Sequence, residues 1–395
     1  MITFSRRTGW PAEPNRLSEA WAHCRAVRPD AVDLTLSNPT AAGLPYPEEA
    51  ILRALSDPRA LLYEPASRGL PSALEALARD LTRAADAVSP DHLVLTASTS
   101  EAYGWLFKLL TERGDEILVP RPSYPLLEFL ADLEETRLVS YPLRYDGRWQ
   151  IDFDALEAAC TERTRAVVVI HPNNPTGNFL DLDDARRLGE ICARRGLAIL
   201  SDEVFLEYRL GSANELRAGT LAALDLPTLT VSLGGLSKCA ALPQIKIGWM
   251  RVGGPSALAR EALSRLEVIA DTYLSVNTPA QWGLETLLAT RSAARDAIRA
   301  RIESNDAALR SALGPQSPIS ALHTEGGWST VLRLPRVRSE EAWTLGLLEE
   351  EAIQVHPGYF FDFDQEAYWV VSLLPRPEQF VPAIERALRY VERHA

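Results

Sequence analysis

A lysine in a glycine-rich, polar segment is the residue of this chain best suited to covalent chemistry. Lys238 lies in V-S-L-G-G-L-S-K-C, after a β-branched run. A lysine amine in a closed pocket can form a Schiff base with an aldehyde, and small neighbouring residues let a phosphate-bearing cofactor approach the backbone closely. A serine-lysine pair in a loop is usually a solvated turn, so the value of this motif depends on the rest of the chain.

Polar residues also follow three other predicted strands. The run H-L-V-L-T leads into T-A-S-T-S-E-A (96–102), whose small hydroxyl residues open a predicted helix and could form an anion site from free N–H groups. The run R-A-V-V-V-I leads into H-P-N-N-P-T-G (171–177), a rigid turn that presents Asn173 and Asn174. The run L-A-I-L leads to Asp202. Taken alone, a helix N-cap and a tight turn are the more ordinary explanations of the first two segments.

The elements that must position these residues alternate along the chain. Between about residues 93 and 252, short β-rich runs alternate with amphipathic stretches, which predicts a mostly parallel sheet covered by helices on both faces. In an open sheet of this kind, ligands bind beyond the carboxyl ends of the strands. Helices are expected at 184–195, at 255–290 with a bend near 276–279, at 292–313 and from about 377. Beyond residue 291 the pattern favours an α+β lobe with an antiparallel sheet.

Composition limits the classes of function. The chain has 395 residues, too many for one ordinary compact core, so two lobes are expected. Its formal charge of -12 argues against general binding to nucleic acid or to an anionic membrane, because both need a basic surface. No apolar stretch reaches membrane-spanning length and the first residues carry no apolar signal core, which indicates a cytoplasmic protein. The four cysteines lie far apart, so neither a disulfide framework nor a metal site is indicated.

Taken in order, these motifs resemble those of fold-type I pyridoxal-phosphate enzymes, specifically the class I and II aminotransferases. The shared features are N-P-T-G, an aspartate at a strand end about thirty residues later, and S-K with a basic residue eight positions after the lysine. The segments Y-E-P-A-S-R-G-L (63–70), P-S-Y-P (122–125) and V-H-P-G-Y-F-F (355–361) are similar to three further segments of that family. The resemblance runs in register from about Asp33 to Ser372.

This resemblance implies both an architecture and an assembly. The expected fold is α/β, with a mostly parallel seven-stranded sheet sandwiched by helices in a large cofactor-binding domain, 48–285. A smaller α+β domain is expected from 1–47 plus 286–395. In this family the residue that matches Tyr63 reaches the phosphate of the neighbouring subunit's cofactor, which implies a homodimer with shared active sites.

The resemblance also implies a role for each matching residue. Lys238 is the catalytic residue, which holds pyridoxal 5′-phosphate as a Schiff base and moves a proton at the substrate. Asp202 pairs with the pyridine nitrogen, and the protonated ring then serves as an electron sink. Asn174 donates to the phenolic oxygen of the cofactor, and Tyr124 stacks on its ring. The expected phosphate ligands are Ser98, Thr99, Ser237 and Lys246.

Several positions depart from the family's pattern. Phe205 stands where the family usually has a tyrosine, and the loss of a phenol that favours the ionised cofactor oxygen should leave the Schiff base protonated to higher pH. Lys246 stands where the family has an arginine, so a single ammonium group replaces a planar guanidinium that can form two parallel hydrogen bonds. The smaller departures are Gly235 for serine, Ser98 for glycine and Gln244 for glycine. None of these changes removes the cofactor.

The substrate side departs further. In typical members an arginine in an R-[IL]-S strand binds the substrate carboxylate with two hydrogen bonds, and Val370 holds that place here. Either another cation binds the carboxylate, or the preferred substrate has none there, because a buried unpaired carboxylate is costly. The candidate substrate contacts are Ser37, Arg68, Arg333 and Arg376. Aromatic residues near the expected mouth, Trp328, Tyr359 and Phe360, suggest a partly apolar pocket.

The leading hypothesis is an aminotransferase that moves an amino group from an amino donor to a 2-oxo acid by a ping-pong mechanism. The alternative is a pyridoxal-phosphate lyase or decarboxylase acting on an amino acid, since one fold serves all of these reactions. A non-catalytic cofactor-binding sensor would be expected to lack the lysine. A dinucleotide-binding protein would be expected to carry G-x-G-x-x-G after its first strand, which T-A-S-T-S-E-A is not.

Overall fold

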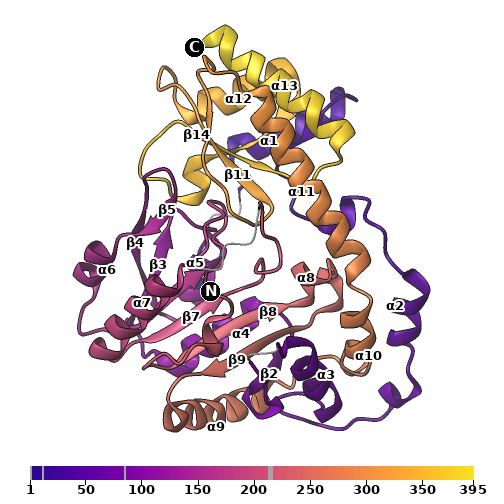
Figure 1. Cartoon of the computed structure of the whole chain (residues 1–395), viewed down its shortest axis with the longest axis vertical. Coiled ribbons are helices and arrows are strands. Elements are labelled where there is room, and N and C mark those ends of the chain that lie inside the picture. Colours follow the sequence, from indigo (N-terminus) through magenta and orange to yellow (C-terminus); the bar gives the residue numbers. More distant parts are fainter. Residues whose placement is uncertain (1, 11–12, 84–85, 212–216) are drawn as a thin grey trace.

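The chain folds into a large α/β lobe and a smaller lobe that combines both ends of the sequence (Figure 1). The structure is a computed structural model, and it describes residues 2–10, 13–83, 86–211 and 217–395. In Figure 1 the C-terminal elements and α1 (Arg16–Val27) lie together above the large sheet. The long helix α11 (Ser292–Ala312) runs from the large lobe into the smaller one.

The large lobe is built on a mixed sheet that has eight strands in the described residues. Their spatial order is β2 (Leu93–Thr96), β9 (Gly248–Gly253), β8 (Thr230–Gly235), β7 (Ala198–Asp202), β6 (Thr164–Ile170), β3 (Glu116–Arg121), β4 (Arg137–Tyr145) and β5 (Trp149–Ile151). The five strands from β8 to β4 are parallel. Strands β9 and β5 run antiparallel to their neighbours. The carboxyl ends of β2, β8, β7, β6, β3 and β4 therefore meet at one edge.

Helices cover both faces of this sheet because alternate strand residues point to opposite sides. On one face, Ile117, Val168 and Leu200 pack with apolar residues of α4 (Thr99–Leu110), α5 (Leu126–Leu133) and α9 (Ser256–Tyr273). On the other face, their neighbours Leu118 and Val167 pack with α6 (Phe153–Ala159) and α7 (Leu182–Arg195). The remaining helices of this lobe are α2 (Glu48–Leu55), α3 (Pro71–Leu81), α8 (Leu236–Cys239) and α10 (Thr278–Ala289).

The smaller lobe contains a four-stranded antiparallel sheet. Its order is β10 (Ser320–Ala321), β11 (Ser329–Arg333), β14 (Tyr368–Ser372) and β13 (His356–Pro357). It packs with α11, α12 (Glu340–Glu351) and α13 (Pro377–His394). A short parallel pair, β1 (Val32–Asp33) and β12 (Ile353–Gln354), joins the N-terminal segment to this lobe. A core that includes Leu34, Trp343 and Trp369 fills it.

The expected fold class is confirmed. The sheet is mostly parallel and sandwiched by helices, and β5 adds a short hairpin strand to the seven that were expected. The predicted interruption near 276–279 separates α9 from α10, and the antiparallel sheet of the smaller lobe is present. The domain boundaries 48–285 and 1–47 plus 286–395 remain a prediction. No helix in the described ranges is both long and apolar enough to span a membrane.

Candidate functional site

Lys238 lies just beyond the carboxyl end of a central strand. Strand β8 ends at Gly235, and Lys238 is the third residue of the short helix α8 that follows directly. The Lys238 side chain is half-buried. Burial lowers the pKa of this amine, while the nearby Asp202 carboxylate acts in the opposite direction. The amine is therefore more easily deprotonated than an exposed lysine.

Three aromatic residues, Phe205, Tyr208 and Trp328, form an aromatic wall beside Lys238. The Lys238 Nζ atom lies 5.4 Å from the ring centroid of Phe205 and 5.0 Å from that of Trp328. The Trp328 ring meets Phe205 and Tyr208 edge-on, at centroid distances of 5.2 and 5.1 Å. The Tyr208 hydroxyl donates a hydrogen bond of 2.6 Å to the backbone carbonyl of Lys238. The aromatic wall thus restricts both the side chain and the backbone of the lysine.

Asp202 ends β7, the strand next to β8. Its carboxylate accepts hydrogen bonds from the Tyr103 hydroxyl at 3.2 Å and from the Val204 amide at 3.2 Å. Burial raises the pKa of Asp202 to about 6, and the two hydrogen bonds and the Lys238 charge only partly offset this. A positively charged partner would lower this pKa, so the site suits a ligand that brings a protonated ring nitrogen.

The turn after β6 presents two asparagines with different surroundings. Asn173 is buried, and its amide nitrogen donates to the Pro122 carbonyl at 3.1 Å and to Thr176 Oγ1 at 2.7 Å. It links this turn to the segment that carries Tyr124, while its Oδ1 is buried without a hydrogen-bond partner among the described residues. Asn174 is half-buried. Of the two, Asn174 has the more accessible side chain for a ligand.

The N-terminus of α4 lies at the end of β2 at the same edge of the sheet. Ser98 is the N-cap, and its Oγ accepts from the Glu101 amide at 3.2 Å. Thr99 opens the helix, so its N–H belongs to the first turn, which has no partner within the helix. A Cβ added to Gly248 would lie 3.1 Å from the Thr99 nitrogen. The start of α4 therefore packs so closely on Gly248 that a side chain at this position would clash with it.

The other expected cofactor contacts lie closer to solvent. Ser237 is half-buried on α8, beside Lys238. Lys246 is exposed in a left-handed conformation with φ of 61°. Tyr124 and Tyr63 are 49% and 74% exposed. The exposed positions of Tyr124 and Tyr63 leave both rings free to contact a ligand or a second subunit.

The expected substrate contacts are dispersed. Ser37 is exposed. Arg68 donates to the Asp91 carbonyl at 2.9 Å, and its Nε lies 3.7 Å from a Glu267 carboxylate oxygen. The Arg376 guanidinium lies directly against Gly43, and Arg333 is exposed on β11. A substrate contact by any of these residues remains a prediction.

Val370 lies in an apolar environment on β14. It is 2% exposed and packs in a cluster with Val331 and Phe361. In the sheet it is directly opposite Val331 on one side and His356 on the other, so these side chains share one face. Burial lowers the pKa of His356, and Asp33 partly offsets this. This face of the small sheet favours uncharged groups.

We call the polar residues at the carboxyl ends of these strands, Ser98, Thr99, Asn174, Asp202 and Lys238, the strand-end cluster. Two further polar residues, which the sequence did not predict, contact it. Glu101 accepts hydrogen bonds from the Ala97 amide at 2.7 Å and from Ser275 Oγ at 2.8 Å. The spacing S-x-x-E from Ser98 is a capping-box signal that could have identified it. Tyr103, the partner of Asp202, lies on the buried face of α4, and no local signal distinguishes it from a core tyrosine.

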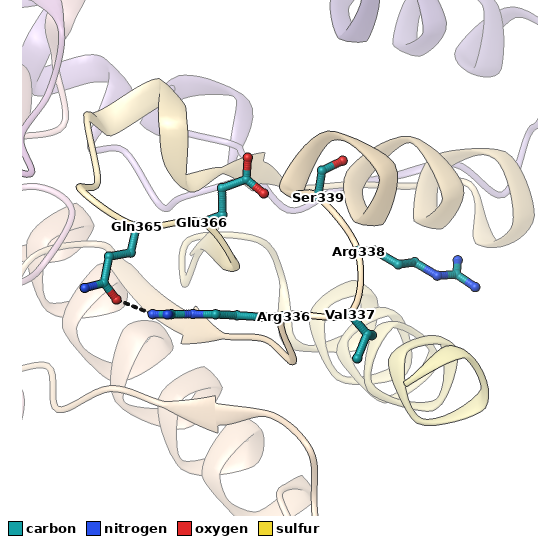
Figure 2. A pocket seen from close by; sticks show the side chains of 6 residues that line it. All are labelled: Arg336, Val337, Arg338, Ser339, Gln365 and Glu366. Carbon is teal, nitrogen blue, oxygen red and sulfur yellow. Dashed lines mark hydrogen bonds between the residues drawn. The ribbon is translucent and has the colours of Figure 1, made fainter.

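A separate surface pocket lies on the smaller lobe and shares no residue with this cluster. Its volume is about 500 Å³, and Figure 2 shows the six residues that line it, Arg336, Val337, Arg338, Ser339, Gln365 and Glu366. The Arg336 guanidinium donates to the Gln365 amide oxygen across it. The pocket therefore carries no part of the strand-end chemistry. In the described part of the chain, no three His, Cys, Asp or Glu side chains gather as metal ligands would.

The strand-end cluster has the donor set that pyridoxal phosphate needs. A half-buried amine with a lowered pKa can meet its aldehyde, and a half-buried carboxylate can meet its pyridine nitrogen. The first-turn N–H groups at the N-terminus of α4 suit its phosphate. The residues present therefore fit this cofactor.

Comparisons with known proteins agree with this geometry. A sequence model of the family described as aminotransferase class I and II matches residues 29–370. The chain is 32% identical to barley nicotianamine aminotransferase B over 58% of its length, and that stretch covers 41% of the barley protein. It is 31% identical to a glutamate-pyruvate aminotransferase of Escherichia coli over 65% of its length, which covers 62% of that enzyme. The chain thus spans less than two thirds of the length of these relatives.

Solved structures share the fold. An alanine aminotransferase from Pyrococcus furiosus superimposes with a TM-score of 0.88 at 22% identity, covering 99% of this chain and 100% of that one. A tyrosine aminotransferase from Leishmania infantum gives a TM-score of 0.83 at 21% identity, covering 97% of this chain and 99% of that one. At these identities the likeness shows the fold.

Proposed function

The chain belongs to the class I and II aminotransferases, and from this premise we propose that it is a pyridoxal-phosphate-dependent aminotransferase. It moves an amino group from an amino donor to a 2-oxo acid by a ping-pong mechanism. The observation that supports this proposal most strongly is that Lys238 and Asp202 lie together at the ends of two neighbouring strands. The first is an amine whose pKa is lowered by burial, and the second is a half-buried carboxylate at the end of the adjacent strand.

Each side chain of the cluster then has a task. When bound, pyridoxal phosphate supplies an aldehyde that condenses with amines and a ring that accepts electrons from the neighbouring carbon. The Nζ of Lys238, whose pKa is lowered by burial, would take a proton from the substrate's Cα and pass it to the carbon that carries the cofactor's aldehyde. Asp202 would hold the proton on the ring nitrogen, and Asn174 would donate to the phenolic oxygen. Tyr124 would stack on the cofactor ring.

The phosphate contacts follow from the first turn of α4. Its free N–H groups and the helix dipole attract an anion, and the hydroxyls of Ser98, Thr99 and Ser237 supply further donors. Lys246 contributes a point charge from the solvent side. These residues would hold the phosphate at the edge of the sheet.

The same proposal includes a homodimer. The loop that leads to Tyr63 exposes Leu61 and Leu62, at 88% and 63%, and the end of α9 exposes Tyr273 and Leu274, at 50% and 42%. Exposed apolar side chains of this size suit an interface between subunits. Sedimentation at micromolar concentration should give twice the chain mass. A cytoplasmic location remains a prediction from the sequence.

The activity is tested by a half-reaction screen. The holoenzyme is mixed with amino acids and simple amines, and the visible absorption of the cofactor is followed until the pyridoxamine form appears. A 2-oxo acid added afterwards should restore the starting spectrum. Conversion by none of the donors would contradict the aminotransferase assignment. Release of CO₂ or of a β-substituent without conversion would support the lyase or decarboxylase alternative instead.

A further inference from the structure

Arg121 joins the two lobes beside the residue expected to stack on the cofactor. It is the last residue of β3 in the large lobe and lies three residues before Tyr124. Its Nε donates a hydrogen bond of 2.7 Å to the backbone carbonyl of Asp362 and lies 3.4 Å from a carboxylate oxygen of Asp364. Both aspartates follow the short helix η7 (Gly358–Phe361), between β13 and β14 of the smaller lobe. The end of β3 is therefore bound to this turn.

The segment 121–125 is held from both lobes. On the side of the smaller lobe, the Ser123 amide donates to the Phe361 carbonyl at 2.9 Å, next to the contact made by the arginine. On the side of the large lobe, Asn173 donates to the Pro122 carbonyl at 3.1 Å. The turn of the smaller lobe also carries two aromatic residues that the sequence places at the mouth of the site. The segment thus connects the cofactor side to this mouth.

Packing between the segment and the turn is incomplete. A cavity of about 150 Å³ has both Tyr124 and Asp362 among its lining residues. Glu128 lines the same cavity, and its pKa is raised by burial and by the nearby carboxylates of Asp362 and Asp132. These like charges repel one another, and the Arg121 guanidinium offsets the repulsion. The hydrogen bonds of the arginine therefore matter more here than apolar contact.

We propose that Arg121 is a positioning residue that couples the Tyr124 segment, 121–125, to the turn 358–364 of the smaller lobe. A cofactor ring stacked on Tyr124 would thereby order the turn at the mouth of the site. A ligand that orders the turn would, by linkage, strengthen cofactor binding by the same free energy. This inference rests on the proposed function, because it takes Tyr124 as the residue that stacks on the cofactor.

The test follows amide hydrogen exchange of the intact protein by mass spectrometry, before and after pyridoxal 5′-phosphate is added. In the cofactor-free Arg121→Ala variant, 121–125 and 358–364 should both exchange about tenfold faster than in the wild type, because a hydrogen bond from a charged donor is lost. Added cofactor should slow exchange in both segments of the wild type. In Arg121→Ala it should slow exchange in 121–125 alone.

Arg165→Ala is the matched control. The Arg165 side chain is 40% exposed, against 39% for Arg121, and it also pairs with an aspartate, since its Nε lies 2.9 Å from a carboxylate oxygen of Asp115. It is the second residue of β6, at the amino end of that strand and away from the strand-end cluster. Its loss should leave exchange in 121–125 and 358–364 unchanged.

Three results would overturn the inference. They are unchanged exchange in cofactor-free Arg121→Ala, cofactor protection that still reaches 358–364 in this variant, and faster exchange throughout its chain, which would mean a general loss of stability. If the cofactor protects neither segment of the wild type, the stacking role given to Tyr124 in the proposed function fails. The comparison of the cofactor-free proteins then still decides whether Arg121 couples the two segments.

Discussion

The two sides of the strand-end cluster differ in their chemistry. On the large-lobe side, Lys238, Asp202 and the first turn of α4 supply charge and hydrogen bonds at neighbouring strand ends. On the small-lobe side, Trp328 and Val370 present buried, mostly apolar surface. The large-lobe side thus carries polar groups of the kind that pyridoxal phosphate requires, and on the small-lobe side Val370 stands where the resemblance predicts an arginine.

The largest expected effect comes from the polar side. Lys238→Ala should lower the transamination rate by at least about 10³-fold, because the proton-transferring amine is lost. Stopped-flow absorption measures the rate. Lys108→Ala is the matched control, since Lys108 pairs with Glu134 and lies 5.7 Å from the Tyr273 ring centroid, away from the strand-end cluster. Similar losses in both variants would contradict the special role of Lys238.

The apolar side is tested by placing a charge in it. Val370→Asp should lower the free energy of unfolding by about 3 kcal/mol or more, because an unpaired carboxyl would be buried against Val331 and Phe361. Val370→Ala, which only creates a cavity, should cost about 1 to 2 kcal/mol. Urea unfolding of both variants measures the difference. If Val370→Asp were as stable as Val370→Ala, water or a cation would have to reach this face. The small-lobe side would then not be apolar, which contradicts the contrast with the large-lobe side.

The pKa of Asp202 predicts a pH dependence in the cofactor-free protein. Its folded-state value of about 6 lies above the ordinary value of 3.8. The stability contribution of this group is therefore fully present below 3.8 and is lost as pH rises toward 6. Relative to Asp202→Asn, the wild type should lose about 2 kcal/mol of unfolding free energy between pH 4 and pH 7. If the unfolding free energies of the two proteins changed equally with pH, Asp202 would not be desolvated in the folded state.

The smallest expected effect concerns the backbone of the lysine. Tyr208→Phe removes the hydrogen bond to the Lys238 carbonyl and should cost about 1 kcal/mol of stability. Tyr141→Phe removes an equivalent bond of 2.8 Å to the Val168 carbonyl and should cost about the same. Only Tyr208→Phe should change the pH at which the visible absorption band of the holoenzyme titrates. If this pH shifted in both variants, or in neither, Tyr208 would have no special role in positioning Lys238.

The sequence predicted the polar side better than the apolar side for a physical reason. Ser98, Asp202 and Lys238 each follow a recognisable strand, and parallel strands bring their ends to one edge. Tyr103 and Tyr208 owe their places to packing between distant segments, which no local pattern records. Trp328 was expected near the mouth, but nothing in G-G-W-S predicts that its ring lies 5.0 Å from Lys238 Nζ. Contacts made by tertiary packing required the structure.

The central claim is that Lys238 is the residue to which pyridoxal phosphate is attached. The chain has three lysines, Lys108, Lys238 and Lys246, so borohydride reduction of the holoenzyme followed by peptide mass spectrometry can distinguish all of them. The account predicts a phosphopyridoxyl group on the peptide that contains Lys238 and none on the other two. A label on Lys108 or Lys246, or no label on any lysine of a protein that binds the cofactor, would contradict it.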